Sequence, residues 1–231
     1  MGILAIIPAR SGSRGLKNKN IKELLGMPMM AYSIRAALES KIFDTVMVST
    51  DSEEYASIAK KYGAEVPFLR SEYASSNTAS TRDCIIEVLK KYEEKGIKYD
   101  RFMILQPTSP LRKEAHIKEA FKLFEEKNAK SVISVCEMEH SPLWSNILKS
   151  DLCMKNFIYR SKDDIRQNLD IYYRINGAIY LHDVKYYLEH EYFYDDTSFA
   201  YIMPKINSVD IDDEFDFNIA EIFLSKEGLQ A

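Results

Sequence analysis

The chain has 231 residues, of which 46% are hydrophobic and 29% are charged, and this composition excludes an intrinsically disordered protein. Its 31 Lys and Arg residues against 35 Asp and Glu residues give a net charge of −4, so a general nucleic-acid-binding surface is excluded as well. The length suits one large domain or a domain with an arm. We expect a small anionic ligand and no nucleic-acid partner.

Cysteine usage and the first apolar run bear on the cellular location. Cys84, Cys136 and Cys153 are widely spaced, with no CxxC pair and no histidine pattern for zinc nearby, which is typical of reduced thiols. Residues 3–9 are apolar but too few to cross a bilayer, and no basic segment precedes them. We therefore expect a cytoplasmic protein that does not bind membranes.

Short β-rich runs alternate with longer amphipathic runs as far as Val135. The pattern predicts buried strands at residues 3–8, 45–49, 65–69, 102–105 and 131–135, and helices at residues 29–40, 53–62, 81–95 and 113–127. This alternation predicts an α/β, Rossmann-like fold with a mostly parallel sheet and helices on both faces. In such sheets, ligands bind beyond the carboxyl ends of the strands.

The alternation breaks after Val135. Residues 137–174 contain isolated aromatic residues without a clean period, so we predict a dimerisation arm inserted into a core of residues 1–136 and 175–231. The alternative is a packed subdomain whose aromatic residues fill a core. Regular order returns with predicted strands at 176–182 and 200–203, a helix at 184–191 and a terminal helix that starts near Asp213.

A basic, glycine-containing loop follows the first predicted strand. The segment IIPARSGSRGLKNKN, residues 6–20, contains Arg10, Arg14, Lys17 and Lys19. Glycine lets a backbone approach phosphates closely and the cations neutralise them, so the loop is predicted to bind a polyphosphate. It lacks both the GK[ST] ending of a P-loop and the dinucleotide motif GxGxxG. The alternative is a solvated basic turn.

A second candidate site is the acidic segment SVDIDDEFD, residues 208–216. If residues 209–212 end a strand, Asp210 and Asp212 point to the same side, and such a carboxylate pair suits Mg²⁺. The alternative is helix capping, in which Asp212 or Asp213 accepts from free N–H groups and Glu214 favours the helix dipole. Both can hold, with the metal on Asp210 and Asp212.

A third candidate is LQPTSPLR, residues 105–112, at the end of the fourth predicted strand. Its prolines fix a turn at the carboxyl edge of the sheet, where Gln106 and Arg112 supply polar groups for a hydroxylated or carboxylated ligand. The alternative is that Ser109 caps the following helix, and the two roles are compatible.

Together these motifs resemble one enzyme family. IPARSGSRGLKNKN, LQPTSPLR, NGAIY at residues 176–180 and DIDDEFD match, in order and at similar spacing, the CMP-N-acetylneuraminate synthetases, or acylneuraminate cytidylyltransferases. The likeness runs from Ile3 to Phe223. It implies that the anomeric hydroxyl of a nine-carbon 2-keto acid sugar attacks the α-phosphorus of CTP, giving a CMP-sugar and pyrophosphate.

The resemblance also implies roles for individual residues. Arg10, Lys19 and Asp212 would be catalytic, and Asp210 and Asp212 would hold Mg²⁺, with Mn²⁺ as the alternative ion. Asp212, or a water that it orients, is also a candidate general base. The implied nucleotide contacts are Arg10, Arg14, Lys19, Asn20, Arg70 and Thr81. The implied acceptor contacts are Gln106, Arg166, Tyr180, Phe193 and Tyr194.

Among the acceptor contacts, Arg166, Phe193 and Tyr194 match residues that the family delivers from the partner subunit, which implies a homodimer with an exchanged arm. Tyr194 replaces a phenylalanine of the family, and Arg14 stands where a lysine is common. The expected acceptor is N-acetylneuraminate. Legionaminate, pseudaminate and Kdo are the alternatives, and so is a non-catalytic nucleotide- or sugar-binding module. The scattered histidines are predicted to be structural: His116, His140, His182 and His190.

Overall fold

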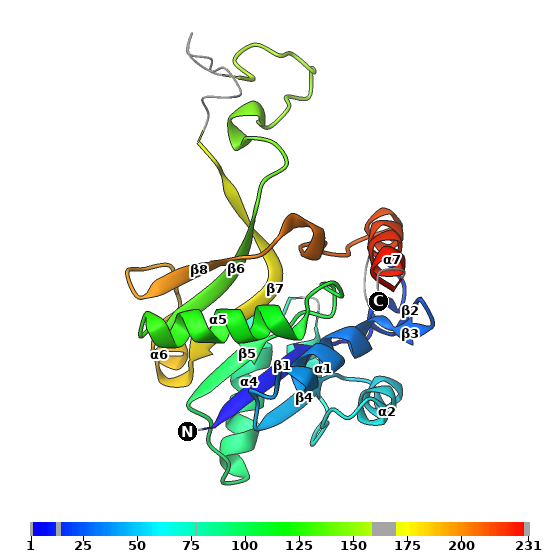
Figure 1. Cartoon of the computed structure of the whole chain (residues 1–231), viewed down its shortest axis with the longest axis vertical. Coiled ribbons are helices and arrows are strands. Elements are labelled where there is room, and N and C mark those ends of the chain that lie inside the picture. The colour runs from blue at the N-terminus through cyan, green and yellow to red at the C-terminus, as the bar shows by residue number, and fades with distance from the viewer. Residues whose placement is uncertain (1, 13–14, 77, 159–169, 229–231) are drawn as a thin grey trace.

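The computed structural model describes residues 2–12, 15–76, 78–158 and 170–228, and its centre is a six-stranded sheet in the order β4-β1-β5-β7-β6-β8 (Figure 1). The parallel pairs are β1 with β4, β1 with β5, and β6 with β8, whereas β7 runs antiparallel between β5 and β6. The sheet is therefore mostly parallel, as predicted. Its strands are β1 (Ile3–Pro8), β4 (Thr45–Ser49), β5 (Arg101–Ile104), β6 (Ser131–Glu137), β7 (Tyr173–Asp183) and β8 (Ser198–Ile202).

Helices cover both faces of this sheet because successive side chains of a strand point to opposite sides. Ile7 shares a buried cluster with Ile34 of α1 and Phe124 of α5, on the face turned toward the viewer in Figure 1. Ile6 instead shares a second cluster with Val88 of α4. The main helices are α1 (Met29–Ser40), α2 (Glu53–Lys61), α4 (Thr81–Glu94), α5 (Glu114–Glu126), α6 (Val184–Glu189) and α7 (Glu214–Gly228).

Shorter elements complete the fold. They are η1 (Lys19–Ile21), β2 (Glu23–Leu24), β3 (Met27–Pro28), α3 (Glu72–Ser75), η2 (Pro142–Trp144) and η4 (Lys205–Asn207). Within the ranges given above, no helix has the length and apolar character needed to cross a membrane. The three cysteines are free thiols, as predicted.

Most predicted elements agree with the structure to within a few residues, but the strand predicted at 65–69 is wrong. There, Glu65 alone forms an isolated bridge, to Met47. Pro67 follows two residues later and has no N–H group to donate to a neighbouring strand. The segment therefore leaves the sheet after a single contact.

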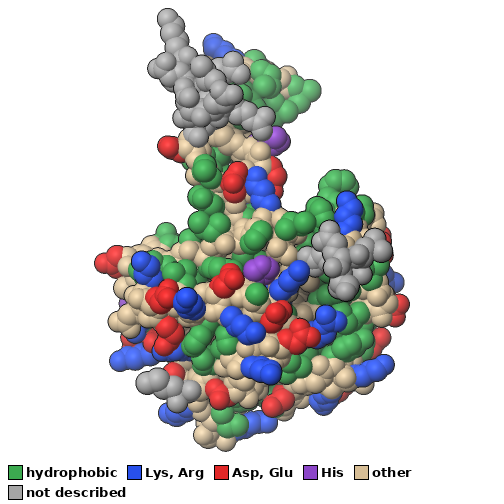
Figure 2. Space-filling view, viewed as in Figure 1, with side chains coloured by type: hydrophobic (Ala, Val, Ile, Leu, Met, Phe, Trp, Pro, Cys, Tyr) green, Lys and Arg blue, Asp and Glu red, His purple; other side chains and the backbone are tan. Residues whose placement is uncertain are grey.

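The described residues between β6 and β7, 138–158 and 170–172, project away from the sheet (Figure 1). The two strands still pair at Glu137 and Tyr173, so the predicted arm begins and ends within paired strands. Figure 2 shows a protrusion on a narrow neck, with apolar side chains on its described surface. The exposed apolar residues include Ile147, which is 91% exposed, and Leu152 and Met154.

Candidate active site

The loop after β1 is exposed along much of its described length, but contacts of Arg10 and Asn20 fix its start and its end. The guanidinium Nη1 of Arg10 donates to the carbonyl oxygens of Ser75 and Ser76, at 3.3 Å each. Asn20 is buried, and its Nδ2 donates to the Arg10 carbonyl at 3.0 Å. Lys17, in contrast, is exposed. The structure therefore positions Arg10 and Asn20 and leaves Lys17 in solvent.

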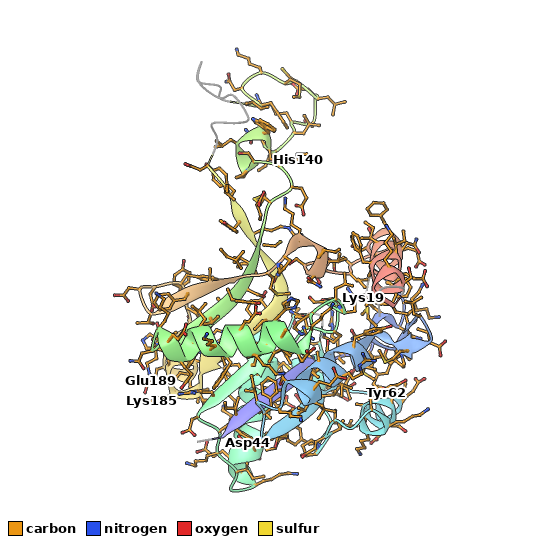
Figure 3. All side chains as sticks on the ribbon, in the orientation of Figure 1. Lys19, Asp44, Tyr62, His140, Lys185 and Glu189 are labelled. Carbon is orange, nitrogen blue, oxygen red and sulfur yellow. The ribbon has the colours of Figure 1, made fainter. Side chains whose placement is uncertain are left out.

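Lys19 joins this loop to the acidic segment. Its Nζ donates to the Ile211 carbonyl at 2.6 Å and to Oδ1 of Asp212 at 3.1 Å. A Cβ on Gly15 would lie 2.4 Å from the Asp212 carbonyl oxygen, so only glycine permits this approach. Figure 3 shows Lys19 close to α7, beyond the end of β1. Lys19 and Asp212 are 193 residues apart in the sequence, so two distant segments meet here.

Asp210 lies against β7 in an environment that disfavours its charge. Gly177 has a φ of +77°, and a Cβ there would lie 3.2 Å from Oδ2 of Asp210. Burial raises the pKa of Asp210 and the nearby Asp212 adds to the rise, whereas a hydrogen bond with Thr108 opposes it. A cation would relieve this unfavourable pairing of carboxylates, so the two aspartates fit a hard divalent ion.

The strand assumed for Asp210 and Asp212 is nevertheless wrong, because residues 208–213 do not form a strand. The segment is held instead by the turn at 105–112. The Ile211 N–H donates to the Thr108 carbonyl at 2.9 Å, and Nδ2 of Asn207 donates to the Leu111 carbonyl at 3.1 Å. The two candidate motifs therefore lie side by side.

The capping prediction for this segment is confirmed at one residue. Oδ1 of Asp213 accepts from the backbone N–H groups of Phe215 and Asp216, at 2.9 and 3.1 Å, where α7 begins. Glu214 forms an ion pair with Lys22 at 2.8 Å. Asp213 is thus used in the fold, while the Asp212 side chain, 82% exposed, stays open to a ligand.

Two predictions for the turn at 105–112 are wrong. Arg112 is buried, and its Nη1 donates to the carbonyls of Gln106 and Ala178, at 3.2 and 2.8 Å, so it braces the turn against β7 and does not face a ligand. Burial lowers the pKa of its guanidinium to about 9. Ser109 is also buried, and its hydroxyl has no partner in the described chain. It does not cap α5, which starts at Glu114.

Asn176, in the NGAIY motif, has a role that the sequence analysis missed. Its side chain is 1% exposed, with Nδ2 donating to Oγ of Ser208 at 2.9 Å and Oδ1 accepting from Oγ of Ser134 at 2.6 Å. It therefore fastens the start of the acidic segment to β6 and β7. The motif was visible in the sequence, but the burial of this amide depends on contacts between distant segments.

Three cavities adjoin at the carboxyl edge of the sheet, and Gln106 lines all of them. We name them the nucleoside, phosphate and acceptor cavities after the contacts expected there. The nucleoside cavity, about 230 Å³, is lined by Arg10, Arg70 and Thr81, and the phosphate cavity, about 430 Å³, by Arg10, Lys19, Asn20 and Asp212. The acceptor cavity, about 320 Å³, is lined by Thr81, Tyr180, Phe193 and Tyr194.

The acceptor cavity is built from aromatic rings of one chain. Phe193 stacks on Tyr187 with ring centroids 4.7 Å apart. Burial raises the pKa of Tyr180 further above neutral pH, to about 12, and its protonated hydroxyl is a possible donor. The resemblance implies that Phe193 and Tyr194 act across a dimer interface; in the single chain both line this cavity. Arg14 and Arg166 lie outside the described residues.

Comparison with known proteins shows the family of this chain. The family model described as cytidylyltransferase matches residues 4–224. The chain belongs to the cytidylyltransferase family. An N-acylneuraminate cytidylyltransferase of Escherichia coli O18:K1:H7 is 39% identical over 99% of the chain, which spans only 53% of that relative's length. A CMP-N,N'-diacetyllegionaminic acid synthase of Legionella pneumophila is 36% identical, over 96% of the chain and 95% of the relative.

Other members and solved structures extend the comparison. A pseudaminic acid cytidylyltransferase of Campylobacter jejuni is 32% identical over 95% of the chain and 94% of the relative. A CMP:2-keto-3-deoxy-manno-octonic acid synthetase structure, solved in complex with CTP, shares the fold, with a TM-score of 0.73, 14% identity, and coverage of 98% of this chain and 100% of the other. The family and the fold expected from the four motifs are therefore confirmed.

Proposed function

We propose that this protein transfers CMP from CTP to the anomeric hydroxyl of a nonulosonic acid, with release of pyrophosphate. The observation that carries the proposal is the contact of Lys19 with Asp212, because it brings a basic loop and an acidic segment to one cavity. Nucleotidyl transfer requires this combination, since cations must neutralise phosphate oxygens while carboxylates hold a metal ion. The adjoining acceptor cavity supplies space for the second substrate.

The basic loop holds the triphosphate in this proposal. Arg10 and Lys19 line the phosphate cavity, and Arg14 belongs to the same loop. Arg70 and Thr81 line the nucleoside cavity, where they contact the cytidine together with Asn20 beside Arg10. The solved 2-keto-3-deoxy-manno-octonic acid synthetase, which has the same fold, is complexed with CTP, and this supports CTP as the nucleotide.

Asp210 and Asp212 hold Mg²⁺, or Mn²⁺ in its place. Within the described residues, no group of three His, Cys, Asp or Glu side chains could hold a metal ion, so an ion on Asp210 and Asp212 would also need oxygen ligands from the nucleotide or water. The ion supplies charge neutralisation on the phosphoryl group when it is bound. Asp212, exposed at the cavity, is placed to accept the acceptor's hydroxyl proton directly or through a water.

The acceptor is a carboxylated nine-carbon sugar, with N-acetylneuraminate as the first choice. The names of the relatives include N-acylneuraminate, diacetyllegionaminic acid and pseudaminic acid, which supports this substrate class. Gln106, Tyr180, Phe193 and Tyr194 line its cavity. Arg166 remains a predicted contact from the arm of a partner subunit.

A homodimer that exchanges its arms completes the proposal. The exposed apolar residues of the arm, such as Ile147, would be buried against a second copy. Ile147→Asp should shift the protein toward the monomer in sedimentation velocity. Ile97 is also an exposed apolar residue but lies outside the arm, so Ile97→Asp should not cause this shift.

The decisive experiment is pyrophosphate release from CTP and Mg²⁺ with a panel of nonulosonic acids and Kdo. Release with at least one nine-carbon acid is expected. Release with Kdo alone would reassign the acceptor. A complete lack of release across the panel would instead support a non-catalytic binding module.

A further inference from the structure

The acceptor cavity contains one arginine that the motifs do not include. Arg82, the second residue of α4, lines the cavity beside His182 and Phe193. Its guanidinium carbon lies 4.8 Å from the ring centroid of Tyr187 and 5.5 Å from that of Phe193. These cation–π contacts hold the charge at the wall of the cavity.

The hydrogen-bonding capacity of Arg82 is not filled by the protein. Its Nη1 is buried and has no partner in the described chain. The adjacent carboxylate, Asp83, is already engaged, since its Oδ2 accepts from the N–H and the hydroxyl of Ser80 in the cap of α4. A buried donor without an acceptor is unfavourable, so the site favours a ligand that supplies one.

The other residues that line the acceptor cavity carry no charge that would repel an anion or bind it in place of Arg82. None of the residues that line the acceptor cavity is acidic. His182, 2% exposed, also has an Nδ1 without a partner among the described residues. Burial, with a smaller contribution from Arg82, lowers the pKa of His182 to about 3. The imidazole is therefore neutral at physiological pH, and among the described residues that line the cavity Arg82 alone supplies positive charge.

The position of Arg82 in its helix is also unfavourable for stability. It lies in the first turn of α4, where the helix dipole favours anions and disfavours cations. A cation that stands against the helix dipole, and that lines a cavity of ligand size, is typical of a binding residue.

We propose that Arg82 binds the carboxylate of the acceptor from within the same chain, while His182 offers Nδ1 to a neutral hydroxyl or amide beside it. The assignment rests on the proposed function, because it concerns the acceptor of that reaction. It places the acceptor's carboxylate beside α4, whereas the family resemblance offered only Arg166 of a partner subunit as an arginine for the acceptor.

The test compares N-acetylneuraminate with its uncharged methyl ester in the wild type, Arg82→Met and Arg82→Lys. Arg82→Met should weaken binding of the acid about 10- to 100-fold, the range for a lost charge-assisted hydrogen bond, and leave the ester and the KM for CTP unchanged. Arg82→Lys should keep much of the preference for the acid. Arg35→Met, at an exposed position of α1, is the matched loss of a cation elsewhere.

Binding is measured by ligand-observed NMR as well as by turnover. A preference of Arg82→Met for the acid equal to that of the wild type would overturn the assignment while wild-type turnover upholds the proposed function. Wild-type protein that binds the acid over the ester but releases no pyrophosphate would reject only the proposed function. A melting temperature of Arg82→Met at or above that of the wild type is expected, and a marked fall would indicate a structural role instead.

Discussion

The phosphate cavity and the acceptor cavity share Gln106 but are held in different ways. Around Lys19 the contacts are made largely to backbone carbonyls and depend on glycines that leave no room for a Cβ, as at Gly15. Around Phe193 the contacts are made by aromatic rings, and Tyr194 is half exposed. The first site therefore tolerates little change in backbone, whereas the second can alter its specificity through side chains alone. Relatives named for three different acids fit that division.

The largest effect is expected from removing the carboxylate at the phosphate cavity. Asp212→Ala should lower Mg²⁺-dependent turnover by more than about 100-fold with every acceptor, because both charge neutralisation and the contact with Lys19 are lost. Asp213→Ala is the matched variant, since this neighbouring carboxylate caps α7. It should lower stability by about 1 kcal/mol and keep the turnover. Undiminished turnover in Asp212→Ala would exclude the metal role.

A pair of glycines tests whether the backbone of β7 controls the position of the Asp210 carboxylate. Gly177 and Gly96 have nearly equal φ, +77° and +78°, but a Cβ meets Asp210 only at Gly177. Alanine at either position should cost about 1–2 kcal/mol of stability. Gly177→Ala alone should also lower turnover, by about 10- to 100-fold, because it displaces Asp210. Equal turnover in the two variants would show that Asp210 can move without consequence.

A smaller effect is expected in the acceptor cavity. Tyr194→Phe removes one hydroxyl and should change the ratio of kcat/KM among the nonulosonic acids by up to about 10-fold, with the KM for CTP unchanged. Tyr192→Phe, on the exposed ring that contacts Tyr194, should leave the ratios as they are. If the KM for CTP rises with Tyr194→Phe, the acceptor cavity does not act independently of the nucleotide-binding cavities.

The smallest effect concerns stability on acidification. The pKa of His182 in the folded chain is about 3, below its ordinary 6.5, so between these values the unfolded chain takes up a proton that the folded chain does not. Stability should therefore fall as the pH drops below about 6.5. His182→Phe should reduce the loss in melting temperature between pH 7 and 5 by on the order of a few degrees. His140→Gln, on the exposed arm (Figure 3), should show the wild-type loss.

The order of elements could be predicted because burial leaves a local signal in the sequence. The strand at 45–49 and the helix at 29–40 were predicted with their observed bounds, since each carries a continuous apolar run or stripe. The strand at 65–69 failed because its valine and phenylalanine gave the same signal, although Pro67 breaks the pairing. Local pattern shows that a segment is buried, but not what it pairs with.

Several residues of the site could be predicted from the sequence composition, but the contacts that they make could not. Arg10 and Lys19 stood out in a basic loop and Asp212 in an acidic segment, and the three do line one cavity. Arg112 stood out equally and is a buried brace, whereas Arg82 lay unnoticed in an ordinary amphipathic helix and lines the acceptor cavity. The difference between these arginines depends on which carbonyls and rings lie opposite, and those come from distant parts of the chain.

The position of Gln106 has a consequence for inhibitors. Because this one side chain lines all three cavities, the space beside Arg70 and the space beside Tyr180 both adjoin Gln106. A single molecule that spans them past Gln106 loses its translational freedom once, whereas two separate ligands lose it twice. Joined nucleotide and acid groups should therefore bind much more tightly than either group alone, provided that the linker matches the path along the carboxyl edge of the sheet.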